Sequence, residues 1–321
     1  MFFLQLRMYI LIIFLFSILY AIVSMIGYAA GISSHSFYLI AALLMTGVQY
    51  MIGPKLIELF MGVRYIGRDE NPGLYAMVAD MAAKAQIPMP RVAISRLQIP
   101  NAFAFGRWLR DGRVCVTEGI LRLLNEAELR AVLGHEIAHI KNRDVLTITM
   151  LSVVPLVLYH ISRHLLWFGN RGNRRGQGNT AVVGLIALLA YFITNLLVLY
   201  ASRIREYFAD RGSVVLGNHP RHLATALYKL VYGSARAPRD SVRMVEGAKA
   251  FFINDPSRAG KELRELKEID QDLSGSIDAD ELRALQNTAV RLSAADKLIE
   301  LFGTHPNMLK RIKQLATYVQ A

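Results

Sequence analysis

The sequence predicts a mainly α-helical, multi-pass membrane protein that carries a cytosolic α+β domain and an inserted helix-loop-helix unit. Three observations lead to this prediction. Long uncharged apolar segments recur along the 321 residues, a His-Glu-x-x-His motif occupies 135–139, and an acidic loop with a central glycine occupies 270–281. The chain is 53% hydrophobic although it contains 37 Lys and Arg residues, because its apolar residues are gathered into blocks.

The first apolar blocks predict a membrane hairpin over residues 1–54. Tyr9–Ile32 and Phe37–Pro54 contain no charged residue, and about 20 apolar residues match the roughly 30 Å hydrocarbon core of a bilayer. A secretory signal fits less well, because the first run is too long and a second run follows the short turn Ser33–Ser36.

The distribution of basic residues predicts the orientation of this hairpin. The turn between its segments lacks Lys and Arg, whereas Lys55, Arg64 and Arg68 follow the second segment. By the positive-inside rule, the amino terminus and everything after Pro54 should face the cytoplasm. The lone Cys115 rules out an internal disulfide and agrees with a reducing compartment.

A second membrane hairpin is predicted over residues 145–202. Val145–Ile161 and Thr180–Ser202 are apolar, and Gly169–Asn179 joins them with a loop that contains three arginines. Complete spans would place these arginines outside, against the positive-inside rule, whereas a shallow or re-entrant hairpin would keep them inside. Val145–Ile161 fits a buried helix of a soluble domain equally well. The sequence leaves these alternatives open.

The net charge of +12 predicts contact with membrane lipids and not with nucleic acid. Basic surfaces are attracted to anionic lipid headgroups. A basic run interleaved with aromatic residues would indicate nucleic-acid binding, and the sequence contains no such run.

The region between the membrane segments is predicted to be α+β. Helical spacing over Tyr75–Ala85 ends before Pro88. Short stretches rich in β-branched and aromatic residues then predict three strands, with an Asp111-Gly112 hairpin turn before the last: Arg91–Ser95, Ala102–Phe105 and Arg113–Thr117. Asn125 can cap the next helix, which runs through the histidine motif.

The motif His135-Glu136-x-x-His139 predicts a zinc site. Positions i and i+4 share one face of a helix, so both imidazoles can bind one ion. Glu136 follows the first histidine and can take a proton from a zinc-bound water. The alternative is a surface helix that carries two unrelated histidines, so the surrounding sequence has to decide.

Glu206 is the candidate third ligand, because a catalytic zinc site needs three protein ligands. Glu206 and Asp210 lie four residues apart and share a helix face. Glu206 can bind the metal while Asp210 accepts a hydrogen bond from a ligand histidine and fixes its tautomer. Alone, this pair would equally describe two solvated surface charges. Its position after the histidine motif and a membrane segment favours the ligand role.

Five features follow one another in a recognisable order. They are the membrane hairpin, Pro-Asn-Ala-Phe-Ala-Phe-Gly at 100–106, the histidine motif, Arg-Glu-Tyr-Phe-Ala-Asp at 205–210 and the ending Thr304–Ile312. This order resembles the HtpX-type membrane zinc metalloproteases, which are relatives of the CAAX prenyl endopeptidases. Asn307 stands where the ending of that family has a second proline after the histidine.

The resemblance implies a gluzincin-like metalloprotease domain over 55–321 that cleaves membrane or misfolded proteins at the cytoplasmic face. His135, His139 and Glu206 would bind zinc, and Glu136 would take a proton from the zinc-bound water and pass it to the leaving amine. Apart from zinc, catalysis would need no cofactor.

The resemblance also implies a strand at the edge of the cleft that pairs with an extended substrate. Asn101, Ala102 and Phe103 fit this role, although an ordinary hydrophobic strand fits the same residues. His305 stays unassigned, because a histidine before Pro306 suits the start of a helix as well as an oxyanion donor.

Residues 270–281 match the EF-hand calcium loop. Gly275 permits the sharp turn at position 6, and helical spacing flanks the loop over Glu262–Ile269 and Ala279–Leu292. The candidate oxygen donors are the side chains of Asp270, Asp272, Ser274 and Glu281 and the backbone carbonyl of Ser276. We therefore expect an EF-hand-like insertion over 258–293 that binds one Ca²⁺, and the resembled family has no such insertion.

Three interpretations of this loop are open: calcium has a structural role, calcium regulates the enzyme, or the loop binds no calcium. Calcium could order the insertion structurally, or it could gate the cleft by coupling two sites. An acidic helix-loop-helix that never binds calcium would carry the same residues.

The leading hypothesis is a membrane-bound zinc endopeptidase that calcium modulates and whose partners are membrane lipids and polypeptide substrates. A processing protease for lipidated peptides is one alternative. A non-catalytic calcium-binding membrane scaffold is another. Intact Glu136 and Glu206 argue against the scaffold, because a protein without activity has no need of both.

Overall fold

The computed structural model describes residues 35–168, 177–245, 252–272, 274–287 and 293–319. The predicted mainly α-helical character is confirmed. Contacts divide the chain into two compact units. One comprises the described residues up to Ile52 together with Leu146–Ile204, and the other comprises Gly53–Val145 together with Arg205–Ala321.

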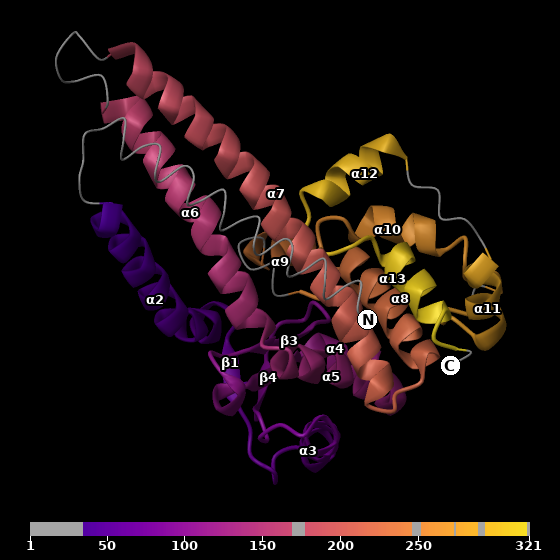
Figure 1. Cartoon of the computed structure of the whole chain (residues 1–321). Coiled ribbons are helices and arrows are strands. Elements are labelled where there is room, and N and C mark those ends of the chain that lie inside the picture. The colour runs from indigo at the N-terminus through magenta and orange to yellow at the C-terminus, as the bar shows by residue number, and fades with distance from the viewer. Residues whose placement is uncertain (1–34, 169–176, 246–251, 273, 288–292, 320–321) are drawn as a thin grey trace. The chain divides into compact units, whose positions relative to one another are not determined.

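Long helices supply the first unit. They are α2 (His35–Phe60), α6 (Asp144–Phe168) and α7 (Gln177–Val215) (Figure 1). The end of α2, the start of α6 and the end of α7 belong to the second unit. Within the described residues, two helical stretches are long and apolar enough to cross a membrane, 144–163 and 181–215. Along α7, more than half of the surface of several large apolar side chains is exposed, as at Val182, Leu185, Leu189 and Phe192. Exposed apolar side chains of this size are typical of a helix that contacts a membrane or another protein.

Parts of the predicted membrane hairpins lie outside the described residues. These parts are Tyr9–Ile32 with the start of its turn, and most of the arginine-containing loop before α7. Phe37–Pro54 is helical within α2, Val145–Ile161 within α6, and Thr180–Ser202 within α7. The number of membrane crossings and the orientation therefore stay predictions.

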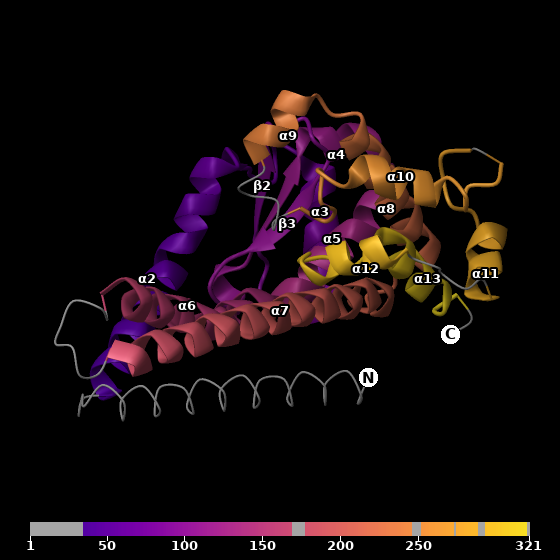
Figure 2. The same cartoon turned by 90° about the horizontal axis from the view of Figure 1, so that it is seen from above.

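A four-stranded sheet forms one layer of the second unit (Figure 2). Its strands are β1 (Val63–Tyr65), β2 (Arg91–Ser95), β3 (Ala102–Phe105) and β4 (Arg113–Thr117), in the order β1-β2-β4-β3. β2 and β4 are parallel, with Arg91 opposite Arg113, whereas β1 and β3 run antiparallel to their neighbours. The three predicted strands have the predicted bounds. β1 was not predicted, because three residues carry too little alternation to detect.

The connection between β3 and β4 differs from the predicted two-residue turn. The strands do form an antiparallel hairpin, but residues 106–112 connect them and contain the 3₁₀ helix η1 (Leu109–Asp111). An Asp-Gly type I′ turn needs positive φ at both residues, and Gly112 has a φ of −61°. The Asp111 carboxylate instead accepts hydrogen bonds from Arg107 Nε at 2.8 Å and Arg113 Nη2 at 2.9 Å.

Helices pack around the sheet. α3 (Pro72–Ala85) and α5 (Glu126–Lys141) were expected, whereas the short α4 (Glu118–Leu123) was not. The predicted cap of α5 is confirmed as a capping box: Asn125 Oδ1 accepts from Glu128 N at 2.9 Å, and Glu128 Oε2 accepts from Asn125 N at 3.0 Å. This cap fixes the start of the helix that carries the histidine motif.

The carboxy-terminal part of the chain adds a layer of helices. They are α8 (Pro220–Ala235), α9 (Arg239–Val245), α10 (Ala259–Leu266), α11 (Ala279–Asn287), α12 (Ala294–Leu301) and α13 (Met308–Ala316). α8 packs against α5, α10 and α13, and its apolar side joins the same hydrophobic core as α3, α5 and the sheet. α8 is therefore the central helix of this unit.

Two glycines let α5 and the last part of α7 approach closely. A Cβ on Gly212 of α7 would lie 2.4 Å from Ala138 Cβ of α5. A Cβ on Gly134 of α5 would lie 2.3 Å from Asn218 Nδ2. Both distances are shorter than real Cβ contacts. The two helices can therefore lie this close only because glycine has no Cβ at these positions.

We predict that Gly212→Ala lowers stability by about 1–3 kcal/mol, the usual cost of overpacking. The added methyl would push α7 away from Ala138, because both atoms belong to rigid helices. Thermal unfolding of the detergent-purified protein measures this change. Gly260→Ala of α10 is the matched control, since nothing lies within 4 Å of its added Cβ. Equal melting temperatures of the two variants would contradict the proposed close contact.

Candidate metal centre

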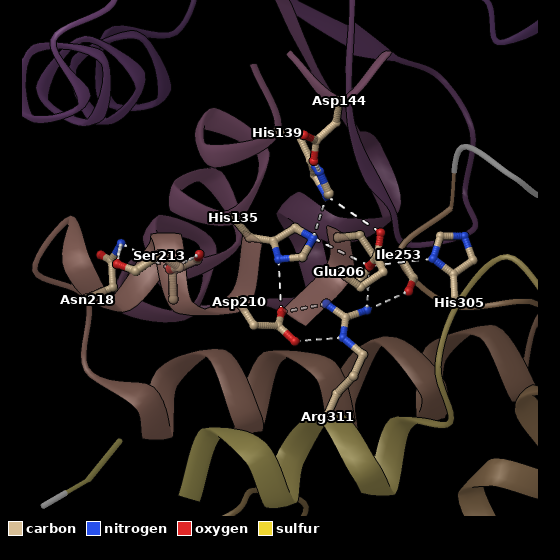
Figure 3. Close-up of polar contacts among 11 residues, drawn as sticks. His135, His139, Asp144, Glu206, Asp210, Ser213, Asn218, Ile253, His305 and Arg311 are labelled. Carbon is tan, nitrogen blue, oxygen red and sulfur yellow. Dashed lines mark hydrogen bonds and ion pairs between the residues drawn. The ribbon is translucent and has the colours of Figure 1, made fainter. Parts of the chain in front are cut away.

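His135 and His139 bring their Nε2 atoms together on one face of α5 (Figure 3). The two atoms lie 3.0 Å apart, and the rings meet edge to face with a centroid distance of 4.6 Å. His135 is 1% exposed, so this face is withdrawn from bulk water. One turn of helix separates the residues, which is the arrangement that the spacing of the motif predicts.

Glu206 of α7 completes a cluster of three donors. Its Oε2 lies 3.7 Å from His135 Nε2, and its Oε1 lies 3.6 Å from His139 Nε2. One donor atom from each residue lies within 4.8 Å of the other two. Two imidazole nitrogens and one carboxylate are a typical ligand set of catalytic zinc.

A carboxylate stands behind each imidazole. Asp210 Oδ1 lies 2.9 Å from His135 Nδ1, and Asp144 Oδ2 lies 2.6 Å from His139 Nδ1. A carboxylate at Nδ1 favours the tautomer with a proton there, which leaves the Nε2 lone pair free. The two Nε2 lone pairs then face each other at 3.0 Å, an arrangement that a cation stabilises. These residues therefore fit a divalent metal ion.

Asp210 was expected to contact a ligand histidine, whereas Asp144 was not considered. Asp144 follows His139 by five residues, and Arg143 between them adopts a left-handed φ of 55°. This turn redirects the chain from α5 into α6 and brings Asp144 back to the imidazole. Helical periodicity alone could not show this contact, because it forms across a break in the helix.

Arg311 of α13 is the second residue that the sequence did not reveal. Its side chain is fully buried, and it donates to Asp210 from Nε at 2.9 Å and from Nη2 at 2.7 Å. Its Nη1 lies 3.0 Å from Glu206 Oε2 and donates to the Ile253 carbonyl at 3.0 Å. Burial alone would lower the pKa of Arg311, but Asp210 and Glu206 outweigh it and raise the pKa. Arg311 therefore stays charged and balances both carboxylates.

The remaining expected residues have distinct surroundings. Glu136 is 3% exposed on α5. His305 Nδ1 lies 3.5 Å from Glu206 Oε2, at the upper limit for a hydrogen bond, so His305 borders the donor cluster. Asn307 caps α13 by accepting from Leu309 N at 2.9 Å and donates to Glu265 Oε2 of α10 at 2.8 Å.

The candidate substrate strand β3 lies beside α5 and pairs, among the described strands, with β4 alone. Its Ala102 and Phe103 side chains are buried. The adjoining Asn101 is fully buried too, and its Oδ1 accepts a hydrogen bond from Ile253 N at 3.0 Å. The Asn101 side chain thus holds Ile253 in place beside the strand.

The carboxylates of the candidate calcium loop converge as well. Asp270, Asp272 and Glu281 each offer an oxygen within 4.8 Å of the others. The Gly275 backbone has the left-handed φ of 76° that position 6 requires. Ser274 Oγ contacts the Ser276 carbonyl at 3.2 Å. α10 and α11 flank this loop, of which residue 273 is outside the described residues.

Comparison with known proteins places the chain in a family. Residues 68–319 match the model of peptidase family M48. The chain belongs to this family. A protease HtpX homolog of Methanothermobacter thermautotrophicus is 49% identical over 228 residues, which are 71% of this chain and 86% of the relative. A protease HtpX homolog of Bifidobacterium longum is 37% identical over 76% of this chain and 82% of its own length.

A solved structure shares the fold. The crystal structure of S. mikatae Ste24p superposes with a TM-score of 0.52 over 93% of this chain at 14% sequence identity. The chain spans 62% of the length of Ste24p, so this similarity concerns the fold alone. The family and its protease relatives support a peptidase, as the histidine motif predicted.

Removal of the buried arginine should destabilise the protein strongly. Arg311→Met leaves Asp210 and Glu206 buried without their counter-charge, and breaking such a pair costs about 3–5 kcal/mol. Thermal unfolding of metal-free protein measures the loss. Arg283→Met, which removes an exposed arginine that pairs with Asp280, should leave the melting temperature unchanged. A loss at Arg311 no larger than at Arg283 would contradict the charge balance described above.

Proposed function

We propose that the chain is a membrane-bound zinc endopeptidase that cleaves membrane or misfolded proteins at the cytoplasmic face. The observation that carries this proposal is the convergence of His135 Nε2, His139 Nε2 and the Glu206 carboxylate, with a carboxylate behind each imidazole. In this site, zinc would supply a Lewis acid that acidifies a bound water and polarises the scissile carbonyl. His135, His139 and Glu206 would hold it.

Glu136 is the proposed general base. It follows His135 directly on α5 and is almost fully buried, so its carboxylate is shielded from bulk water. Glu136 would take a proton from the attacking water and deliver it to the amine that leaves. Arg311, which pairs with Glu206, and Asp210, which contacts His135, would keep the ligand side chains in place during these proton transfers.

The substrate would bind as an extended strand along β3. Among the described strands, β3 is an edge strand next to α5, and an extended polypeptide can pair with the backbone of such an edge. Backbone pairing tolerates many side chains, which suits the cleavage of unfolded segments. The exposed apolar face of α7 supports attachment to a membrane, where membrane-protein substrates would be found.

The test of this proposal is the cleavage of an unfolded protein such as casein by the detergent-purified chain. Wild type with zinc should cleave it, whereas Glu136→Gln should bind zinc equally and lose at least about 100-fold in rate, because general-base catalysis contributes that much. Equal cleavage by both proteins would exclude Glu136 as the base. Zinc binding without cleavage by wild type would favour a scaffold or a processing protease with a narrow substrate.

We also propose that Asp270, Asp272, Ser274, the Ser276 carbonyl and Glu281 bind one calcium ion, and that this ion modulates the peptidase. Contacts of the loop with α8 support this idea. Tyr228 donates to Asp270 Oδ2 at 2.8 Å, and Thr225 Oγ1 donates to the Ile277 carbonyl at 2.9 Å and accepts from Ile277 N at 3.2 Å. A movement of the loop would therefore act directly on the helix that packs against α5.

A second route runs through α13. The helix before the calcium loop holds one end of α13, where Glu265 accepts from Asn307, and the helix after the loop holds the other end, where Gln286 donates to the Ala316 carbonyl. Arg311 lies between these two contacts and pairs with Glu206 and Asp210. A calcium-dependent change in the angle between α10 and α11 would therefore change the position of Arg311.

Replacement of the last calcium ligand should separate binding from modulation. Wild type should bind one Ca²⁺ in equilibrium dialysis, and Glu281→Gln should bind it at least about 10-fold more weakly, because the bidentate carboxylate is lost. At constant free zinc, calcium should change the cleavage rate of wild type but not of Glu281→Gln. An unchanged wild-type rate up to millimolar calcium would leave a structural site only, and absence of binding would exclude the site.

A further inference from the structure

Two buried aspartates near the metal centre have matching surroundings. Asp210 Oδ1 contacts His135 Nδ1, and both carboxylate oxygens of Asp210 accept hydrogen bonds from Arg311. Asp144 contacts His139 Nδ1 with Oδ2, and its Oδ1 pairs with Arg205. Each imidazole is therefore backed by a carboxylate (Figure 3). Each carboxylate is in turn balanced by an arginine.

We infer that Asp144, held by Arg205, is the positioning residue of His139. The inference rests on the proposed zinc site and adds a residue that the chain's motifs do not contain. The contact between Asp144 Oδ2 and His139 Nδ1 is 2.6 Å long, which is within the range of charge-assisted hydrogen bonds. It fixes the ring plane and the Nδ1–H tautomer of His139, so that Nε2 faces Glu206.

The surroundings of Asp144 are built to hold this carboxylate still. Its side chain is 8% exposed, so it would carry an unbalanced buried charge without a cationic partner. Arg205 provides that partner and also donates from Nη2 to the Asn142 carbonyl at 2.9 Å. A single guanidinium thus holds both the Asp144 carboxylate and the backbone of the turn that carries it.

The location of this contact distinguishes it from the Asp210 contact. Asp210 lies on the same helix as Glu206, one turn further on, and its geometry follows from that helix. Asp144 instead begins α6, while Arg205 immediately precedes Glu206 on α7. Asp144 of α6 and Arg205 of α7 therefore orient His139 together. Both helices contain a stretch that is long and apolar enough to cross a membrane.

A structural role for Asp144 is the main rival interpretation, because an aspartate in the first turn of a helix stabilises that helix. The two interpretations differ in what a substitution changes. Loss of a helix contact lowers the melting temperature of metal-free protein, whereas loss of the positioning contact lowers the affinity for zinc. The test therefore needs both measurements.

The experiment measures zinc dissociation constants of the full chain in detergent, by competition with a chromophoric chelator. We expect Asp144→Asn to bind zinc about 10–100-fold more weakly than wild type, the usual effect of losing such a carboxylate. Asp80→Asn is the matched control, because Asp80 also pairs with an arginine, Arg130 of α5, but contacts no metal-cluster histidine. It should leave zinc affinity unchanged.

Substitution of Arg205 provides an independent test of the same contact. Arg205→Gln should weaken zinc binding in the same direction, and the double variant should bind about as weakly as Asp144→Asn alone, because both changes act through one contact. If Asp144→Asn does not fold, Arg205→Gln carries the test. The visible spectrum of Co²⁺-substituted protein should also change in these variants, since it reports ligand geometry.

Two outcomes would overturn the inference in distinguishable ways. Zinc affinity of Asp144→Asn equal to that of Asp80→Asn, in a wild type that binds zinc, would leave Asp144 with a structural role only. A wild type that binds no zinc would overturn the proposed function first, and this inference with it. Unchanged affinity in Arg205→Gln would remove Arg205 from the positioning contact.

Discussion

The burial of three carboxylates beside two imidazoles is the constraint on which the rest of this unit depends. Glu206, Asp210 and Asp144 are each less than a tenth exposed, and an unpaired charge in such a place costs several kcal/mol. Arg311 and Arg205 balance them, and these arginines come from parts of the chain far from the histidine motif. The helices that carry the five side chains must therefore meet at one place. Gly134 and Gly212 permit the close approach of α5, which carries the two imidazoles, to the end of α7.

Much of the second unit could be predicted from local patterns. The bounds of β2, β3 and β4, the cap of α5 and the shared face of His135 and His139 follow from residue periodicity or motif spacing. Glu206 was expected from its position after the motif and from the resemblance. What escaped prediction depends on distant or irregular contacts. Arg311 and Asp210 are 101 residues apart, and Asp144 reaches His139 only because Arg143 takes a left-handed conformation. The first contact requires the tertiary fold to be known, and the second requires the backbone conformation of Arg143, which helical periodicity does not encode.

Side-chain hydrogen bonds connect the loop at 270–281 and its flanking helices to the rest of the second unit. The Asn307 amide donates to Glu265 on α10, the helix before this loop. Thr225, Tyr228 and Gln286 add further bonds between the helix-loop-helix and the helices of the peptidase fold. The helix-loop-helix is therefore connected to α8 and α13 through specific side-chain hydrogen bonds.

The site requires that two imidazoles and a carboxylate hold one metal ion. X-ray absorption at the zinc edge of the purified, zinc-loaded chain can show this, because the spectrum reports the type and number of ligands. We expect about one zinc per chain with two imidazoles and oxygen ligands at about 2.0–2.2 Å, and the loss of one imidazole in His139→Ala. A sulfur ligand, or a spectrum unchanged by His139→Ala, would exclude this ligand set.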